Sequence, residues 1–143
     1  MESIKGKVAI VTGASSGIGR GIAAELAREG VITVLAARSA DKLAGLADEI
    51  VREGGEAIVL PTDVTREDEV LTLFQETERR AGRLDLLVNN AGIADATPTD
   101  ELELARWREI IDVNLTSAFL CSREAIRLMK RAGGGRIINI GSL

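Results

Sequence analysis

A glycine-rich segment, residues 12–19, stands directly behind the apolar run of residues 8–11. The run predicts a strand and the apolar pattern after the segment predicts a helix, so the glycines lie in a strand-to-helix turn. Glycines permit positive φ angles and close backbone approach, while free N–H groups at the start of a helix attract negative charge. The segment therefore predicts a site for a nucleotide pyrophosphate. A glycine-rich turn without a ligand is the alternative.

The spacing of the glycines indicates whether the turn could be the phosphate loop of an ATP or GTP hydrolase. They follow the pattern G-x-x-x-G-x-G, at Gly13, Gly17 and Gly19. The phosphate loop of ATP and GTP hydrolases needs a lysine that binds phosphate and a hydroxyl residue that binds magnesium, whereas the residue after the last glycine here is Arg20. The spacing argues against a nucleotide hydrolase.

Polar residues also follow the next three predicted strands. A site for NAD usually has an acid after the second strand, but this chain has Arg38, which can bind a 2′-phosphate and favours NADP(H) over NAD(H). Asp63 follows the third strand, where the adenine ring would lie, and Asn89 and Asn90 follow the fourth. The alternatives are an Arg38 that caps its loop in solvent, an Asp63 that caps a helix, and asparagines that only form a turn.

Short apolar runs alternate with amphipathic stretches along the chain. Strands are expected at about residues 6–12, 32–37, 57–60, 84–88 and 136–140, with helical patterns between them. Thr65 with Asp68 predicts a capping-box-like start for the third helix. The last helix is expected to be the longest, with an apolar face made of Leu115, Ala118, Phe119, Ser122, Ala125, Ile126 and Met129.

This alternation predicts an α/β fold, a doubly wound parallel sheet of the Rossmann type with five strands. No linker or low-complexity segment divides the chain, so residues 1–143 are expected to form one dinucleotide-binding domain. In such a sheet, ligands bind at the carboxyl ends of the strands. The polar segments described above converge there.

Composition excludes several other classes of function. A net charge of −4 with both signs interleaved argues against nucleic-acid binding. No apolar run reaches the roughly 18 residues of a membrane span, and the first residues lack the features of a signal peptide, so a cytoplasmic protein without membrane contact is expected. The only cysteine, Cys121, is expected to be buried and excludes an internal disulfide; no metal site is expected.

Five motifs, in this order and spacing, resemble the short-chain dehydrogenase/reductase family. The motifs are Thr12–Gly19, Asp63-Val64, Asn89–Gly92, Val113–Leu115 and Arg136–Ser142. The resemblance extends over residues 5–143 and is greatest to the branch that prefers NADP(H) and carries arginine after the second strand. Some members of that branch have a basic residue where this chain has Ser16, so the phosphate clamp here looks half as charged.

The resemblance implies roles for individual residues. Residues on the pyrophosphate and adenosine side are Gly13, Ser15, Ser16, Gly17, Ile18, Gly19, Arg38, Asp63 and Val64, and those along the ribose and nicotinamide are Asn90, Ala91 and Gly92. Asn114 resembles an asparagine that holds a water linking the catalytic lysine to solvent. Ser142 matches the catalytic serine. The alternatives are a local helix cap or bend at Asn114 and a serine that merely starts a loop at Ser142.

The implied reaction is hydride transfer between NADP(H), with NAD(H) as second choice, and a carbonyl or alcohol group of a small molecule. Ser142 would hydrogen-bond the reacting oxygen. The family's Tyr-x-x-x-Lys pair, which moves the proton, follows this serine, and the chain contains no tyrosine.

The residues are therefore expected to be inactive alone and to belong to a longer polypeptide, a homodimer or homotetramer when complete. Exposure of the strand at residues 136–140 as a sheet edge favours the same expectation. Two alternatives remain: a sensor that binds a nicotinamide nucleotide without catalysis, and a half-domain that another chain completes.

Overall fold

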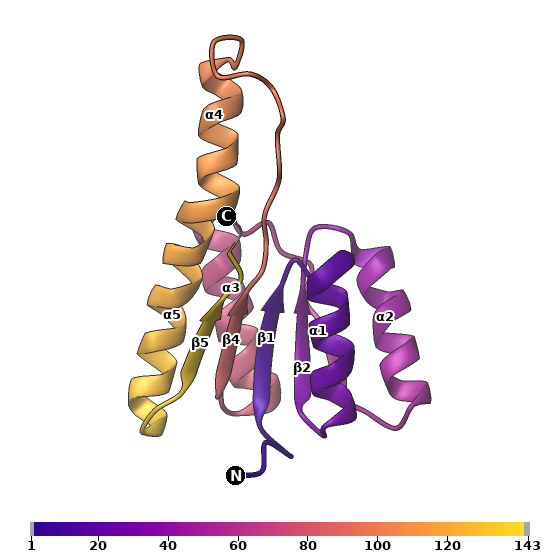
Figure 1. Cartoon of the computed structure of the whole chain (residues 1–143). Helices are drawn as coiled ribbons and strands as arrows, with labels where there is room; N and C mark the ends of the chain where they lie inside the picture. Colours follow the sequence, from indigo (N-terminus) through magenta and orange to yellow (C-terminus); the bar gives the residue numbers. More distant parts are fainter. Residues whose placement is uncertain (1, 142–143) are drawn as a thin grey trace.

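The apolar runs of the sequence form one parallel sheet in the computed structural model, which describes residues 2–141 (Figure 1). Its strands are β1 (Val8–Thr12), β2 (Ile32–Ala36), β3 (Ala57–Val59), β4 (Leu86–Asn89) and β5 (Arg136–Asn139). They lie in the order β3-β2-β1-β4-β5, and all neighbours are parallel. The predicted doubly wound sheet is confirmed, and the predicted strand ends lie within two residues of the observed ones.

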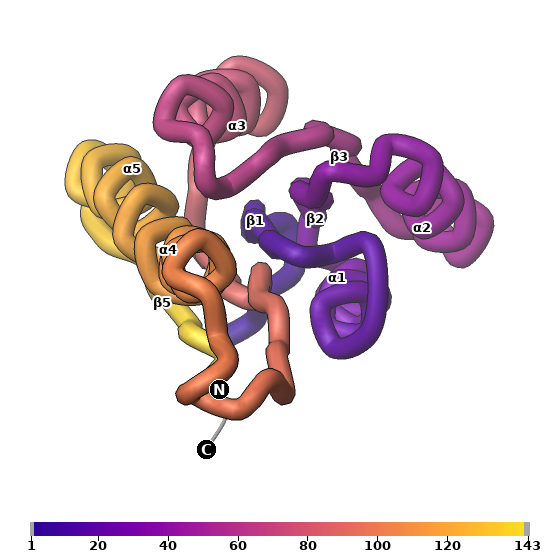
Figure 2. The backbone as a smooth tube through the Cα atoms, turned by 90° about the horizontal axis from the view of Figure 1, so that it is seen from above, coloured from indigo at the N-terminus to yellow at the C-terminus, as the bar shows by residue number. Residues whose placement is uncertain are grey.

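Helices cover both faces of the sheet (Figure 2). One face carries α1 (Gly17–Arg28) and α2 (Ala40–Arg52), and the other carries α3 (Glu67–Ala81) and α5 (Ser117–Ala132). Each face has its own apolar core: Val11 and Leu43 belong to the first, Ile10 and Leu120 to the second. β1 contributes to both cores because successive side chains of a strand point to opposite faces.

The last helical segments form one continuous rod. α4 (Leu104–Ile111) passes through a π-helical turn, η1 (Asp112–Thr116), into α5, and α4 rises beyond the end of the sheet (Figure 1). No pattern in the sequence marks the π-turn. Among residues 2–141, no helix combines the length and the apolar character that crossing a membrane requires.

The predicted apolar face of the longest helix is partly wrong. Ala125 and Met129 are buried as expected, but Leu115, Phe119 and Ile126 are 63%, 59% and 44% exposed. The helix is apolar on more than one side, and periodicity alone does not decide which side meets the sheet. The wider π-turn also shifts the register of the residues that follow it.

Cys121 lies in the core between α5 and the sheet. It is 1% exposed, as predicted, and burial raises the pKa of its thiol to about 12. Within the described residues, no group of three or more His, Cys, Asp or Glu side chains is arranged to hold a metal ion.

The strand order reverses at β1. The chain leaves β3 at one edge of the sheet and crosses to β4, on the other side of β1. The loops that follow β1 and β4 therefore separate at the carboxyl ends of these strands, where open α/β sheets bind ligands. β5 forms the opposite edge, where Ile138 and Ile140 are exposed as expected.

Candidate functional site

A cavity of about 570 Å³ opens at the carboxyl ends of the strands, the position that the sheet topology predicts. Its volume suits a small-molecule site. All of the predicted cofactor-binding residues except Gly19 line this cofactor cavity, together with Ala37, Thr62, Thr65, Ile93, Glu109 and Val113. The fold thus brings the four predicted polar segments to one place.

The N-terminus of α1 borders the cofactor cavity. Ser16 is the N-cap residue, its side chain makes no capping hydrogen bond, and the first turn of α1 contains no acidic residue. The first backbone N–H groups of a helix have no partner within the helix, and they form the positive end of its dipole. The arrangement therefore fits an anion such as a pyrophosphate.

The three glycines of the turn are needed for different reasons. Gly13 and Gly17 have φ angles of +63° and +56°, which disfavour any other residue. A Cβ at Gly13 would also lie 2.9 Å from Nδ2 of Asn90, and one at Gly19 would collide with that atom and with the Gly13 carbonyl. The close approach at Gly13 and Gly19 is therefore to the loop after β4.

Asn90 ties that loop to the glycine turn. Its Nδ2 donates to the carbonyl oxygens of Thr12 and Gly13, at 3.2 Å each. Oγ1 of Thr12 accepts hydrogen bonds from the backbone N–H groups of Asn90 and Ala91, at 3.0 and 3.1 Å. Asn90 thus does more than form a local turn, because its side chain fixes the distance between two walls of the cavity.

Arg38 contributes a positive charge to the cavity wall. It is exposed, lines the cavity and forms no ion pair with another residue of the described range 2–141. The hydrogen bond from the Thr65 side chain lowers the pKa of Asp63, and the charges of Arg38 and Arg66 lower it further. The cavity wall therefore carries the Asp63 carboxylate near the Arg38 guanidinium, which has no ionic partner among residues 2–141.

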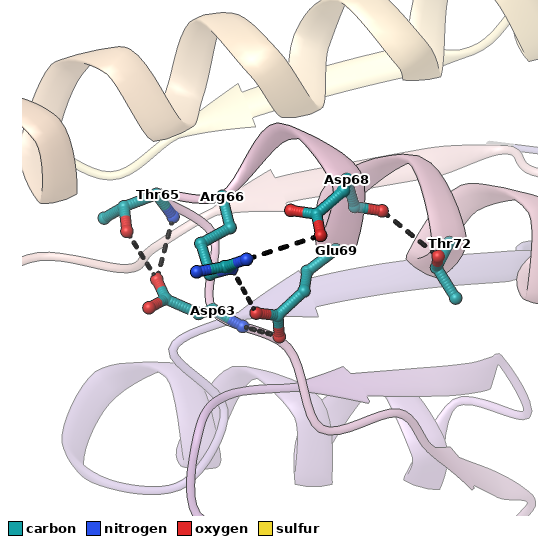
Figure 3. Close-up of polar contacts among 6 residues, drawn as sticks. All are labelled: Asp63, Thr65, Arg66, Asp68, Glu69 and Thr72. Carbon is teal, nitrogen blue, oxygen red and sulfur yellow. Dashed lines mark hydrogen bonds and ion pairs between the residues drawn. The ribbon is translucent and has the colours of Figure 1, made fainter.

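The segment before α3 differs from the predicted capping box (Figure 3). α3 begins at Glu67 after Arg66 as N-cap, and no side chain caps it. Thr65 instead donates its backbone N–H and its hydroxyl to Oδ1 of Asp63, at 3.0 and 2.7 Å. These two hydrogen bonds form a turn centred on Asp63, and they occupy the Thr65 hydroxyl that the predicted capping box would use. Asp63 therefore does not cap the helix.

Two atoms at this end of the cavity lack hydrogen bonds. Among residues 2–141, neither Oδ2 of Asp63 nor the backbone N–H of Val64 has a hydrogen-bond partner. Figure 3 shows Oδ2 pointing away from Thr65 and from the Arg66–Glu69 pair. One acceptor beside one donor complements the edge of adenine, which presents an amino donor next to a ring-nitrogen acceptor.

Asn114 lies in the π-turn and reaches the loop after β4. Its Oδ1 accepts the backbone N–H of Ile93 at 2.7 Å, and its Nδ2 donates to the Ile93 carbonyl at 2.8 Å. Both polar groups of the side chain are thus engaged with one backbone unit of a residue that lines the cavity. The contact positions the loop; it is neither a helix cap nor a purely local bend.

Comparison with known proteins decides the family. The family model described as short chain dehydrogenase matches residues 7–143. The chain belongs to the short-chain dehydrogenase family. Its members are oxidoreductases, and the predicted resemblance is confirmed.

Three similar proteins illustrate the range of this family. A 3beta-hydroxysteroid dehydrogenase of Mediterraneibacter gnavus is 41% identical over 96% of this chain and 50% of its own length. A 3-oxoacyl-[acyl-carrier-protein] reductase of Synechocystis is 42% identical over 100% of this chain and 58% of its own length. A metagenomic short-chain oxidoreductase solved in complex with NADP is 40% identical, with a TM-score of 0.94 over 99% of this chain and 65% of that one. The chain spans about half the length of the curated relatives it matches.

The predicted catalytic serine, Ser142, lies outside the described residues. The strand that leads to it is held by polar side chains: Nδ2 of Asn89 donates to Oδ1 of Asn139 at 2.9 Å and to Oγ of Ser122 at 3.1 Å. The backbone N–H of Ile140 bonds to the Asn89 carbonyl at 2.9 Å. Asn89 is thus more than a turn former, since it connects β4, β5 and α5.

The sequence motifs do not indicate every residue of the cavity. Ile93, Glu109 and Val113 line it from the loop after β4 and from the helical rod. Val113 belongs to the motif Val113–Leu115, and this was the only sequence signal that it lies near the cavity. Glu109 gives no signal, because its place in the wall depends on where the rod crosses the sheet.

Proposed function

We propose that the polypeptide containing this chain transfers a hydride between NADP(H) and a carbonyl or alcohol group of a small molecule. The observation that carries the proposal is the cofactor cavity, in which the N-terminus of α1 and the unpaired Arg38 offer two anion-binding groups. Membership of an oxidoreductase family supports it, as does the relative that binds NADP.

The residues of the cavity fit a phosphorylated dinucleotide from end to end. The helix N-terminus and Ser16 would bind the pyrophosphate, Arg38 the 2′-phosphate, and Asp63 with Val64 the adenine. Asn90, Ala91 and Gly92 would lie along the ribose and nicotinamide. The nicotinamide ring supplies or accepts the hydride when the cofactor is bound. NAD(H) is the second choice because it would leave Arg38 without a phosphate.

The chain itself would contribute two side chains to the chemistry. Ser142 would donate a hydrogen bond to the substrate oxygen on which negative charge develops. Asn114 would hold the loop at Ile93 and the water that the family resemblance implies. The proton relay of tyrosine and lysine lies outside these residues, since the chain contains no tyrosine.

The identity of the substrate is proposed only as a class. Similar proteins are named for a hydroxysteroid and for an acyl-carrier-protein thioester, so the family name does not select one. A cytoplasmic location and a homodimer or homotetramer stay predictions, as does the single domain over residues 1–143.

The test is turnover by the intact polypeptide with NADPH and a panel of ketones, steroids and acyl thioesters. Consumption of NADPH with at least one carbonyl is expected. Replacing Ser142→Ala should lower kcat by about 10²–10³ while leaving the Kd for NADPH unchanged. Saturable NADPH binding without turnover of any carbonyl or alcohol would instead support the sensor alternative and contradict the enzymatic proposal.

A further inference from the structure

Glu69, a charged residue in the first turn of α3, contacts Asp63 at the proposed adenine end of the cavity (Figure 3). Oε1 of Glu69 accepts a hydrogen bond from the backbone N–H of Asp63 at 3.0 Å. Oε2 of Glu69 pairs with Nε of Arg66 at 2.9 Å. Glu69 belongs to none of the motifs of the sequence and does not line the cavity. It contacts the site only through Asp63.

We propose that Glu69 is a positioning residue for adenine recognition. It fixes the backbone of Asp63, and thereby places Oδ2 of Asp63 and the N–H of Val64 so that together they select an amino-substituted purine. The proposal rests on the proposed function, because it concerns the adenine of the same dinucleotide.

The hydrogen bonds around Asp63 leave one carboxylate oxygen for a ligand. Thr65 occupies Oδ1 through two hydrogen bonds, the carbonyl oxygen accepts the N–H of Arg66 at 3.1 Å, and Glu69 occupies the backbone N–H. Without Glu69, that N–H would lose its partner in a partly buried position, which is costly enough to move the backbone. The direction of Oδ2 would then no longer be fixed.

Arg66 restricts the orientation of Glu69. The pair is exposed, so by itself it adds little to stability. Its effect is geometric: with Oε2 bound to Arg66, Oε1 is directed toward Asp63. Asp68 also approaches Arg66, at 3.5 Å, but makes no hydrogen bond to Asp63. Asp68 is therefore a matched control on the same turn, with the same charge.

Adenine recognition can be tested by changing the base of the cofactor as well as the protein. Adenine presents an amino donor and a ring-nitrogen acceptor, whereas hypoxanthine presents a carbonyl acceptor and a ring N–H donor. A carboxylate oxygen beside a backbone N–H matches adenine and repels hypoxanthine at both positions. The hypoxanthine analogue of NADPH is otherwise identical, so the ratio of the two Kd values isolates this contact.

The experiment is a calorimetric titration of the intact polypeptide with NADPH and with its hypoxanthine analogue. The wild type should bind NADPH about tenfold more tightly than the analogue, because the contact is a hydrogen bond to a charged group. Glu69→Asp keeps the charge but shortens the side chain, and Glu69→Ala removes it; in both, the ratio should fall to about two- to threefold. Glu69→Gln keeps an acceptor at the same reach and should retain most of the ratio, while Asp68→Asn should leave it unchanged.

The outcomes separate this proposal from the proposed function. If the wild type binds NADPH but its ratio is near one, or if Glu69→Asp and Glu69→Ala keep the wild-type ratio, the positioning role is refuted while the dinucleotide site stands. If a folded wild type binds neither NADPH nor NADH, the proposed function itself fails. An equal fall in the ratio for Asp68→Asn would show a general charge effect and would also overturn the role of Glu69.

Discussion

Arg38 and Ser16 are the residues that we propose distinguish NADPH from NADH. Arg38 offers an unpaired guanidinium at the cavity wall, and the Ser16 hydroxyl makes no capping bond in α1. A 2′-phosphate adds almost two negative charges to the ligand, and a guanidinium binds such a group through charge-assisted hydrogen bonds. The nearby Asp63 carboxylate opposes part of this attraction. The proposed site for the 2′-phosphate therefore depends on a single positive charge, that of Arg38.

Replacing Arg38→Ala should raise the Kd for NADPH by roughly 10- to 100-fold, because hydrogen bonds to charged groups contribute about 1.5–3 kcal/mol. The Kd for NADH should change by less than about threefold, since NADH has no group for Arg38 to bind. Fluorescence titration with both cofactors measures the two values.

Arg52→Ala is the matched control for this experiment, because Arg52 is an exposed arginine at the end of α2 and does not line the cavity. A variant at position 38 with an unchanged ratio of the two Kd values would refute the cofactor preference.

Cavity residues in the short segments that follow the strands could be predicted from the sequence alone. Arg38, Asp63 and Asn90 line the cavity because parallel strands end at the same side of a sheet. Glu69 could not be predicted in this way. Its contact with Asp63 depends on the path of a six-residue connection, for which the sequence contains no periodic signal.

At the scale of elements, the glycine turn and the loop after β4 form one interlocked unit. Asn90 bonds to the carbonyl oxygens of Thr12 and Gly13, and the absence of a side chain at Gly19 makes room for it. The glycine pattern predicts a close approach of a ligand, whereas at Gly19 the close neighbours are protein atoms of Asn90 and Gly13. The sequence could not show that the approaching partner at Gly19 is protein, because the two loops are more than 70 residues apart in the chain.

Gly19→Ala should lower the free energy of unfolding by about 1–3 kcal/mol, because its Cβ would overlap the Gly13 carbonyl and the Asn90 side chain. Gly21→Ala lies on the same helix, where an added Cβ meets nothing within 4 Å, and should be neutral or stabilising by up to about 1 kcal/mol. Urea denaturation measures both. Equal effects of the two substitutions would contradict the interlock.

The helical rod of α4, η1 and α5 could be predicted only in part from the sequence. Helical segments in this region follow from apolar periodicity, but their connection through η1 and the buried side of α5 do not. Leu120 and Cys121 face the core, while Phe119 faces outward. A π-turn inserts one residue without any change in composition, so periodicity before the turn does not carry over to the residues after it.

At the scale of the whole molecule, the reactivity of the Cys121 thiol tests whether α5 is packed against the sheet. Only the thiolate reacts with alkylating agents, and burial raises the pKa of this thiol to about 12. The native protein should therefore resist iodoacetamide at mildly alkaline pH and react within minutes in denaturant, where the pKa returns to about 8.5. Mass spectrometry of the timed reaction measures the difference. Rapid modification of the native protein would contradict the packing of α5 on the sheet.

The proposed activity requires more than the described cavity. The chain spans about half the length of its curated relatives, and Ser142 lies outside the described residues. The residues proposed to bind the cofactor lie within residues 2–141, whereas the chain contains no tyrosine for the proposed proton relay. Binding is thus the step on which the whole account depends.

The most direct test is calorimetric titration of NADPH into the intact polypeptide and into its Ser16→Asp variant. Aspartate is a favourable N-cap residue, so the variant should fold, but its carboxylate would repel an anion at the N-terminus of α1. The account predicts saturable binding of one NADPH per chain to the wild type and a Kd raised at least tenfold in the variant. Absence of binding to the folded wild type, or equal binding by both proteins, would contradict it.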